Sequence, residues 1–117
     1  MIKPLFHLGT VIATAQVVNS LDEQTILAIV RRHAMGDWGD LCHEDRMSNI
    51  IAIEKGDRLL SRYNLEQFGY EELEDVYVIT EADRSYTTVR ILRQQKDWGK
   101  SPQSFSLLLE IIPYLPI

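Results

Sequence analysis

Cysteine is almost absent from this chain, since Cys42 is the only one among 117 residues. A single thiol excludes an intrachain disulfide and favours a reducing compartment. Long apolar runs are also missing. The longest stretch, LLLEIIPYLPI, is interrupted by Glu110 and two prolines and falls short of the ~20 apolar residues that a membrane-spanning helix needs. The first residues do not resemble a signal peptide. We therefore expect a cytoplasmic protein with no membrane partner.

Basic residues are outnumbered by acidic ones, 12 against 17, for a net charge of −5. Binding to a phosphate backbone needs a clustered basic surface, so we expect no direct contact with nucleic acid. An acidic chain can instead compete for the basic groove of a nucleic-acid-binding protein. The length and the 45% hydrophobic content indicate one domain, residues 1–117, with a core over about 2–93 and a variable C-terminal segment, 94–117.

The first half of the chain predicts a strand followed by two helices. Residues 2–14 are apolar and β-branched, which is typical of one strand or two short ones. Helical spacing then predicts an amphipathic helix over 21–34 that Gly36 ends. Asp40 is placed to cap a second helix that ends at Gly56. The apolar residues that share a face of this second helix are Met47, Ile50 and Ile51.

The second half alternates with a period of two. Strands are predicted over 57–65, 76–80 and 85–92, with a polar turn between the last two. The QQKDWGKSPQS stretch that follows has the composition of a loop, and FSLLLEII is typical of a short helix or strand. The expected fold is α+β, with two helices packed on one face of an antiparallel β-meander and an N-terminal strand.

The stretch RRHAMGDWGDLCHEDR, residues 31–46, concentrates groups that can carry chemistry. Its mixed imidazole and carboxylate set could hold a divalent ion through His33, Asp37, Asp40 and His43. The spacing matches no zinc or calcium signature, and aspartates beside glycines are also what a tight turn requires. We therefore favour a capped turn, with no metal and no cofactor.

Cys42 and Trp38 have structural interpretations as well. Successive helical residues diverge by about 100°, so Cys42 and His43 do not form a catalytic pair, and we expect an inert cysteine that is buried or half-buried. Trp38 stands between Gly36 and an adjacent glycine, where it can fold back over the helices. The alternative for Trp38 is an exposed anchor for a partner. We favour the core position.

The turn ITEADRS, residues 79–85, is the second concentration of charged groups. Turn tips are ordinarily polar, so a structural role is the default. An enzymatic alternative requires this turn and the 31–46 corner to meet in one cleft. The residues of that alternative catalytic site are His33, Asp37, Asp40, Glu81, Asp83 and Arg84.

Acidic residues are concentrated over 66–83, which hold seven carboxylates and no basic side chain, whereas 84–100 hold five basic residues. The two stretches either neutralise each other across the sheet or leave an acidic loop, EQFGYEELED, free for a basic partner. In the second case the partner-binding residues are Glu66, Tyr70, Glu71, Glu72, Glu74 and Asp75.

Three blocks in one order, RHAMGDWGDLCHEDRMSN, GDRLLSRY and ITEADRSYTT, resemble a family of short bacterial proteins carried by plasmids, phages and integrative elements. Members are often labelled as a type I restriction subunit. This chain lacks a Gly-x-Gly-x-x-Gly cofactor loop, so we do not transfer that label. The chain departs from the family at Cys42 and His43, in an insertion around 66–75 and over 93–117.

The setting of that family implies an accessory protein of a mobile element. We expect a non-enzymatic protein that binds a host protein, specifically an inhibitor of a restriction or CRISPR-type defence complex. The alternative is the small enzyme or metal-dependent protein described above. A homodimer joined through the apolar C-terminal segment is a third expectation.

Overall fold

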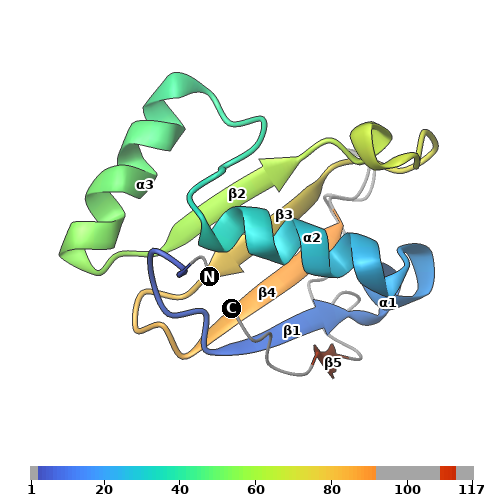
Figure 1. Cartoon of the computed structure of the whole chain (residues 1–117), viewed down its shortest axis with the longest axis horizontal. Coiled ribbons are helices and arrows are strands. Elements are labelled where there is room, and N and C mark those ends of the chain that lie inside the picture. Colours follow the sequence, from blue (N-terminus) through green and yellow to red (C-terminus); the bar gives the residue numbers. More distant parts are fainter. Residues whose placement is uncertain (1–2, 92–108, 113–117) are drawn as a thin grey trace, which may run out of the picture.

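The computed structural model describes residues 3–91 and 109–112. The chain folds as an α+β protein, the class expected from the sequence (Figure 1). Its elements are, in order, β1 (Thr10–Thr14), α1 (Ala15–Ser20), α2 (Glu23–Ala34), α3 (His43–Lys55), β2 (Leu59–Tyr63), the 3-10 helix η1 (Leu65–Phe68), β3 (Val76–Thr80), β4 (Tyr86–Ile91) and β5 (Leu109–Ile112).

The described strands form one sheet with the order β2-β3-β4-β1-β5. The predicted meander is present, because β2, β3 and β4 pair antiparallel, with Leu59 opposite Thr80 and Thr80 opposite Thr87. The N-terminal strand β1 does not continue this antiparallel pattern. β1 pairs parallel with β4, Thr10 opposite Tyr86, and antiparallel with β5, so the sheet is mixed and not wholly antiparallel. Part of the segment 94–117 thus belongs to the same sheet.

Helix α2 covers the sheet as predicted for 21–34 (Figure 1). The Asp22 carboxylate accepts a hydrogen bond from Thr25 N at 2.7 Å and so caps the helix start. The apolar side of α2 is buried, and strands β2 and β3 alternate between buried and half-buried residues, so one face of the sheet contacts the helix. The core residues of α2 are Ile26, Ile29, Val30, His33 and Ala34.

Helix α3 differs from the expectation in its start and in its buried face. It lies beside β2, the edge strand, and buries Asn49 and Ala52 (Figure 1). The N-cap is Cys42 and not Asp40, because the Asp40 carboxylate is hydrogen bonded to Asn64 N instead. The end at Gly56, with φ of 80°, is as predicted. The apolar residues expected to share the packed face, Met47, Ile50 and Ile51, are exposed.

The first fourteen residues form a shorter strand than expected. Only Thr10–Thr14 is extended in the sheet, while Phe6 and Leu8 are buried in the core and Leu5 N donates to Ala34 O. Helix α1, capped by Thr14, was not predicted. The strand Leu109–Ile112 lies within FSLLLEII, and the loop expected over 94–104 lies outside the described residues. Within the described part, no helix is long and apolar enough to cross a membrane.

Candidate functional site

The Gly-Asp-Trp-Gly-Asp corner, residues 36–40, runs alongside the edge of β2. Asp40 N donates to Arg62 O at 2.6 Å, and Arg62 N donates to Trp38 O at 3.2 Å. Gly39, with φ of 77°, approaches so closely that a Cβ there would clash with the Arg62 carbonyl oxygen. The corner is therefore an extension of the sheet, and its second glycine is required by the approach of two backbones.

Trp38 is part of the core, as predicted, with 6% of its surface exposed. Its ring stacks on Phe6, with ring centroids 6.1 Å apart, and meets the His33 ring edge-on at 5.8 Å. Phe6 meets the same histidine edge-on at 5.2 Å. Offset and edge-on arrangements of this kind add to the burial energy of aromatic side chains. The corner thus anchors the N-terminal segment to α2.

His33 extends from α2 onto the sheet, where it is fully buried and takes part in a series of hydrogen bonds with β2 and β3. Nδ1 lies 2.5 Å from Ser61 Oγ, and Nε2 lies 2.9 Å from Thr80 Oγ1. Thr80 Oγ1 is 2.7 Å from Thr87 Oγ1, and the Thr87 hydroxyl donates to Leu8 O at 2.7 Å.

The donor and acceptor in each of these hydrogen bonds follow from the bond that Thr87 donates to Leu8 O. Because Thr87 uses its only proton on a carbonyl, Thr80 must donate to Thr87, and Thr80 can then only accept from His33 Nε2. His33 Nε2 therefore carries a proton. Burial, with a smaller contribution from the positive charge of Arg84, lowers the pKa of His33 to about 3. The ring is then neutral near pH 7, so Nδ1 accepts from the Ser61 hydroxyl.

The two aspartates of the corner are each engaged locally. Asp37 pairs with Arg32 Nε at 2.7 Å and accepts from Gly39 N at 3.2 Å, and the bond from Arg32 holds the pKa of Asp37 below its usual value. Asp40 accepts from Asn64 N at 2.8 Å. Both carboxylates therefore have structural partners around the end of β2.

The hairpin turn is organised by Arg84, which adopts φ of 60°, a conformation that non-glycine residues rarely take. Its guanidinium donates to four carbonyl oxygens, including those of Asp57 at 2.7 Å and Ala52, at the end of α3, at 3.2 Å. Asp83 accepts from Ser85 N and Oγ. Arg84 therefore joins the β3–β4 turn to the C-terminus of α3, where a cation also complements the helix dipole.

The corner and the turn lie at opposite ends of β2. The corner is hydrogen bonded to Arg62, whereas Glu81 follows Thr80, which is paired with Leu59 at the start of the strand. Three to four residues of extended chain span roughly 10–13 Å. Of the six residues of the enzymatic alternative, His33 is enclosed in the core, Asp37 and Asp40 lie at one end, and the turn residues, Glu81, Asp83 and Arg84, lie at the other. Among the described residues, no three His, Cys, Asp or Glu side chains gather to hold a metal ion.

Cys42 is exposed, so the expectation of a buried or half-buried thiol was wrong. It occupies the N-cap of α3 without a side-chain capping bond. The main chain has to leave the β2 edge before α3 can begin, and this places residue 42 outside the core.

The acidic loop, residues 66–75, is held in place by hydrogen bonds and an ion pair to neighbouring elements. Asn64 caps η1 through Glu66 N at 2.8 Å, and the Tyr70 hydroxyl accepts from Asp22 N at 3.1 Å at the start of α2. Asp75 pairs with Arg62 at 2.5 Å. Two of the predicted partner-binding residues, Tyr70 and Asp75, thus hold the loop in place.

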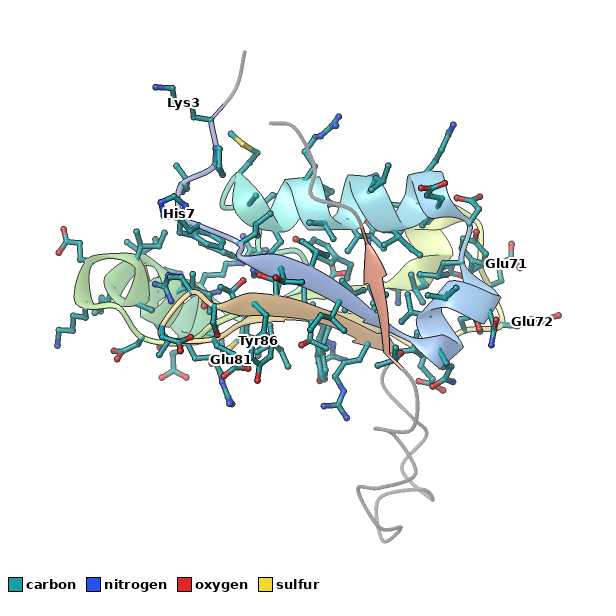
Figure 2. All side chains as sticks on the ribbon, turned by 90° about the horizontal axis from the view of Figure 1, so that it is seen from below. Lys3, His7, Glu71, Glu72, Glu81 and Tyr86 are labelled. Carbon is teal, nitrogen blue, oxygen red and sulfur yellow. The ribbon has the colours of Figure 1, made fainter. Side chains whose placement is uncertain are left out.

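The remaining four residues of that prediction, Glu66, Glu71, Glu72 and Glu74, are exposed and make no ion pair within the described part of the chain. Figure 2 shows Glu71 and Glu72 beside α1, toward the end of the molecule away from Lys3 and His7. The acidic side chains that do form ion pairs near β2, Asp75 and Glu81, use Arg62 and Arg58, so their partners lie on the β2 side. Three of the basic residues expected to neutralise the loop, Arg93, Lys96 and Lys100, lie outside the described residues.

Sequence reasoning missed the role of Asn49. Its side-chain amide donates to Leu60 O at 2.7 Å and its carbonyl oxygen accepts from Leu60 N at 3.1 Å, so the amide pairs with β2 as a neighbouring strand would. The sequence carried no signal for this role, because the apolar pattern of α3 placed Asn49 on the side opposite Met47, Ile50 and Ile51, where a polar residue is expected to face solvent.

A scan against protein-family models and searches of curated proteins and of solved structures gave no match. The resemblance to mobile-element proteins therefore stays a prediction.

Proposed function

We propose that this chain is an accessory protein of a mobile genetic element, which binds a basic host protein through the acidic loop. A restriction or CRISPR-type defence complex, with its positively charged nucleic-acid groove, is the class of partner that this surface fits. The observation that carries the proposal is the display of four exposed carboxylates, Glu66, Glu71, Glu72 and Glu74, on a loop held by Tyr70 and Asp75.

The loop has the physical properties that such binding requires. Charged residues around an interface steer association and select partners of opposite charge. A loop whose ends are hydrogen bonded loses less conformational entropy on binding than a free one. The carboxylates also carry the charge density with which an acidic surface competes for a phosphate-binding groove.

The test is affinity purification of the tagged chain from its host at physiological salt, with mass spectrometry of what co-purifies. The loop variant replaces four glutamates by glutamine, and the matched control removes the same charge elsewhere on the surface. The loop variant is Glu66→Gln, Glu71→Gln, Glu72→Gln and Glu74→Gln, and the control is Glu23→Gln, Asp45→Asn, Glu54→Gln and Asp57→Asn.

We expect a stoichiometric basic protein that is captured by the parent and the control but lost with the loop variant. Its binding should weaken as salt is raised from 0.05 to about 0.5 M, because exposed charges are screened. The purified partner should also lose nucleic-acid binding when the chain is added. Equal capture by the loop variant and the parent would overturn the proposal.

A further inference from the structure

Helix α3 carries an apolar stripe that nothing in the described fold covers. Met47, Ile50 and Ile51 are 42%, 52% and 49% exposed. The opposite side of the helix is docked against β2 through Asn49 and buries Ala52. The stripe is thus on a helix whose orientation is set, and its residues cannot turn inward without breaking the bonds to β2.

The apolar stripe has an acidic residue at the N-terminal end of α3 and a basic residue at its C-terminal end. Glu44, Met47, Ile51 and Lys55 follow one another at spacings of three, four and four residues, which places them along one line of the helix. Glu44 stands in the first turn and Lys55 in the last. Both are exposed, and neither makes an ion pair within the described part of the chain.

We propose that the occupant of this stripe is a second copy of the chain, docked with its α3 antiparallel to the first. Two-fold symmetry brings Met47 of each copy to Ile51 of the other, and Glu44 of each copy to Lys55 of the other. The helix dipoles are then also opposed. A parallel pair would place like charges against each other at both ends, so the charge pattern selects the antiparallel arrangement.

The contact is small and leaves the acidic loop free. Helix α3 has 13 residues and is therefore about 20 Å long. An interface built on one such helix lies at the small end of specific protein contacts, so we expect a dimer that dissociates at about 10–100 µM. The acidic loop lies at the other end of the molecule from α3 (Figure 1), so the dimer would present two of these loops facing outward. The inference does not depend on the proposed function, because mass and partner capture are measured separately.

Sedimentation of the full chain over a concentration series tests the dimer directly. The variant Ile50→Lys with Ile51→Lys places charge in the stripe, and both positions are exposed, so the fold should be kept, as circular dichroism would verify. The matched control is Val18→Lys, which replaces an exposed apolar residue on α1. We expect the stripe variant to raise the dissociation constant at least about tenfold and the control to leave it unchanged.

Cross-linking tests the orientation. In the antiparallel pair, residue 44 of one copy lies beside residue 55 of the other, whereas two copies of residue 44 are about a helix length apart. The test uses the background Cys42→Ser, which removes the sole cysteine. In that background we expect Glu44→Cys combined with Lys55→Cys to give a disulfide-linked dimer under mild oxidation. Neither Glu44→Cys alone nor Lys55→Cys alone should do so.

Three results would overturn the inference. The first is a monomer at every concentration up to about 1 mM. The second is a dimer that the stripe variant does not weaken, which would point to another surface, such as the apolar C-terminal segment. The third is cross-linking through Glu44→Cys alone in the Cys42→Ser background, which would show that the helices run parallel.

Discussion

Lowering the pH should destabilise this protein through His33 before its carboxylates titrate. In the folded chain burial and, to a smaller extent, Arg84 lower the pKa of His33 to about 3, whereas an unfolded histidine titrates near 6.5. The unfolded state therefore binds more protons than the folded state at any pH between these values. The free energy of unfolding must fall as the pH falls, starting near 6.5 and ending near 3.

The size of the effect follows from these two pKa values. Between pH 8 and pH 5 the proton linkage amounts to a loss of about 2 kcal/mol, and the limit for complete protonation is about 5 kcal/mol. Asp22, Asp37 and Asp83 have lowered pKa values and also lose stability on protonation. Their usual value is 3.8, so their contribution above pH 5 is negligible. The interval from pH 8 to pH 5 thus isolates the histidine.

Urea unfolding followed by circular dichroism at several pH values measures the effect. His33→Gln removes the titration and keeps an amide that can bond to the Ser61 and Thr80 hydroxyls, so this variant should be less stable at pH 8 but lose about 2 kcal/mol less on going to pH 5. His7→Gln, at an exposed histidine, should keep the full pH dependence. The reasoning fails if the parent loses under about 0.5 kcal/mol over this interval, or if His33→Gln has the slope of the parent.

Three contacts around the edge strand can each be tested by substitution and urea unfolding, two of them with a matched control substitution. Asn49→Ala should lower the free energy of unfolding by about 1–3 kcal/mol, because it leaves the backbone N–H and C=O of Leu60 unpaired. Light scattering should also show self-association through the exposed β2 edge, whereas Asn19→Ala, at an exposed position, should have neither effect. Gly39→Ala should cost about 3 kcal/mol and Gly56→Ala about 1 kcal/mol, since both have positive φ but only the first meets backbone; equal costs would contradict the close approach. Arg84→Lys should cost about 1–2 kcal/mol despite its kept charge, because one ammonium cannot reach four carbonyls, and an unchanged midpoint would refute that role.

Local patterns predicted those elements whose structure depends on local physics. The helix over 21–34 and the strands over 76–80 and 85–92 were recognisable because the period of their apolar residues and the composition of the adjoining turns agree. The parallel pairing of β1 with β4 was not, because it joins residue 10 to residue 86 and no local signal encodes such a contact. Helix α1 is only six residues long, too short for its period to be recognised.

The face of α3 shows why an apolar pattern can mislead. Met47, Ile50 and Ile51 form the more apolar face, and burial energy alone would turn it inward. The edge of β2 instead leaves backbone groups of Leu60 that need partners, and Asn49 satisfies both. The candidate site was predicted only in part because it too depends on contacts between distant segments and not on a local pattern. The positions of His33 and the hairpin residues depend on which strand each one meets, and that is decided by the assembled sheet.

The place of β1 in the sheet has a consequence for how the protein is made. This strand is synthesised before the other described strands, yet both of its neighbours, β4 and β5, are the last two described strands to be made. The apolar segment Thr10–Thr14 therefore stays without a pairing partner until β2 and β3 have been synthesised. Contacts that distant in sequence form slowly, and an unpaired apolar strand is prone to aggregate while it waits. Yield in the cell should thus depend on translation speed and on chaperones that bind this segment, even for variants whose folded state is fully stable.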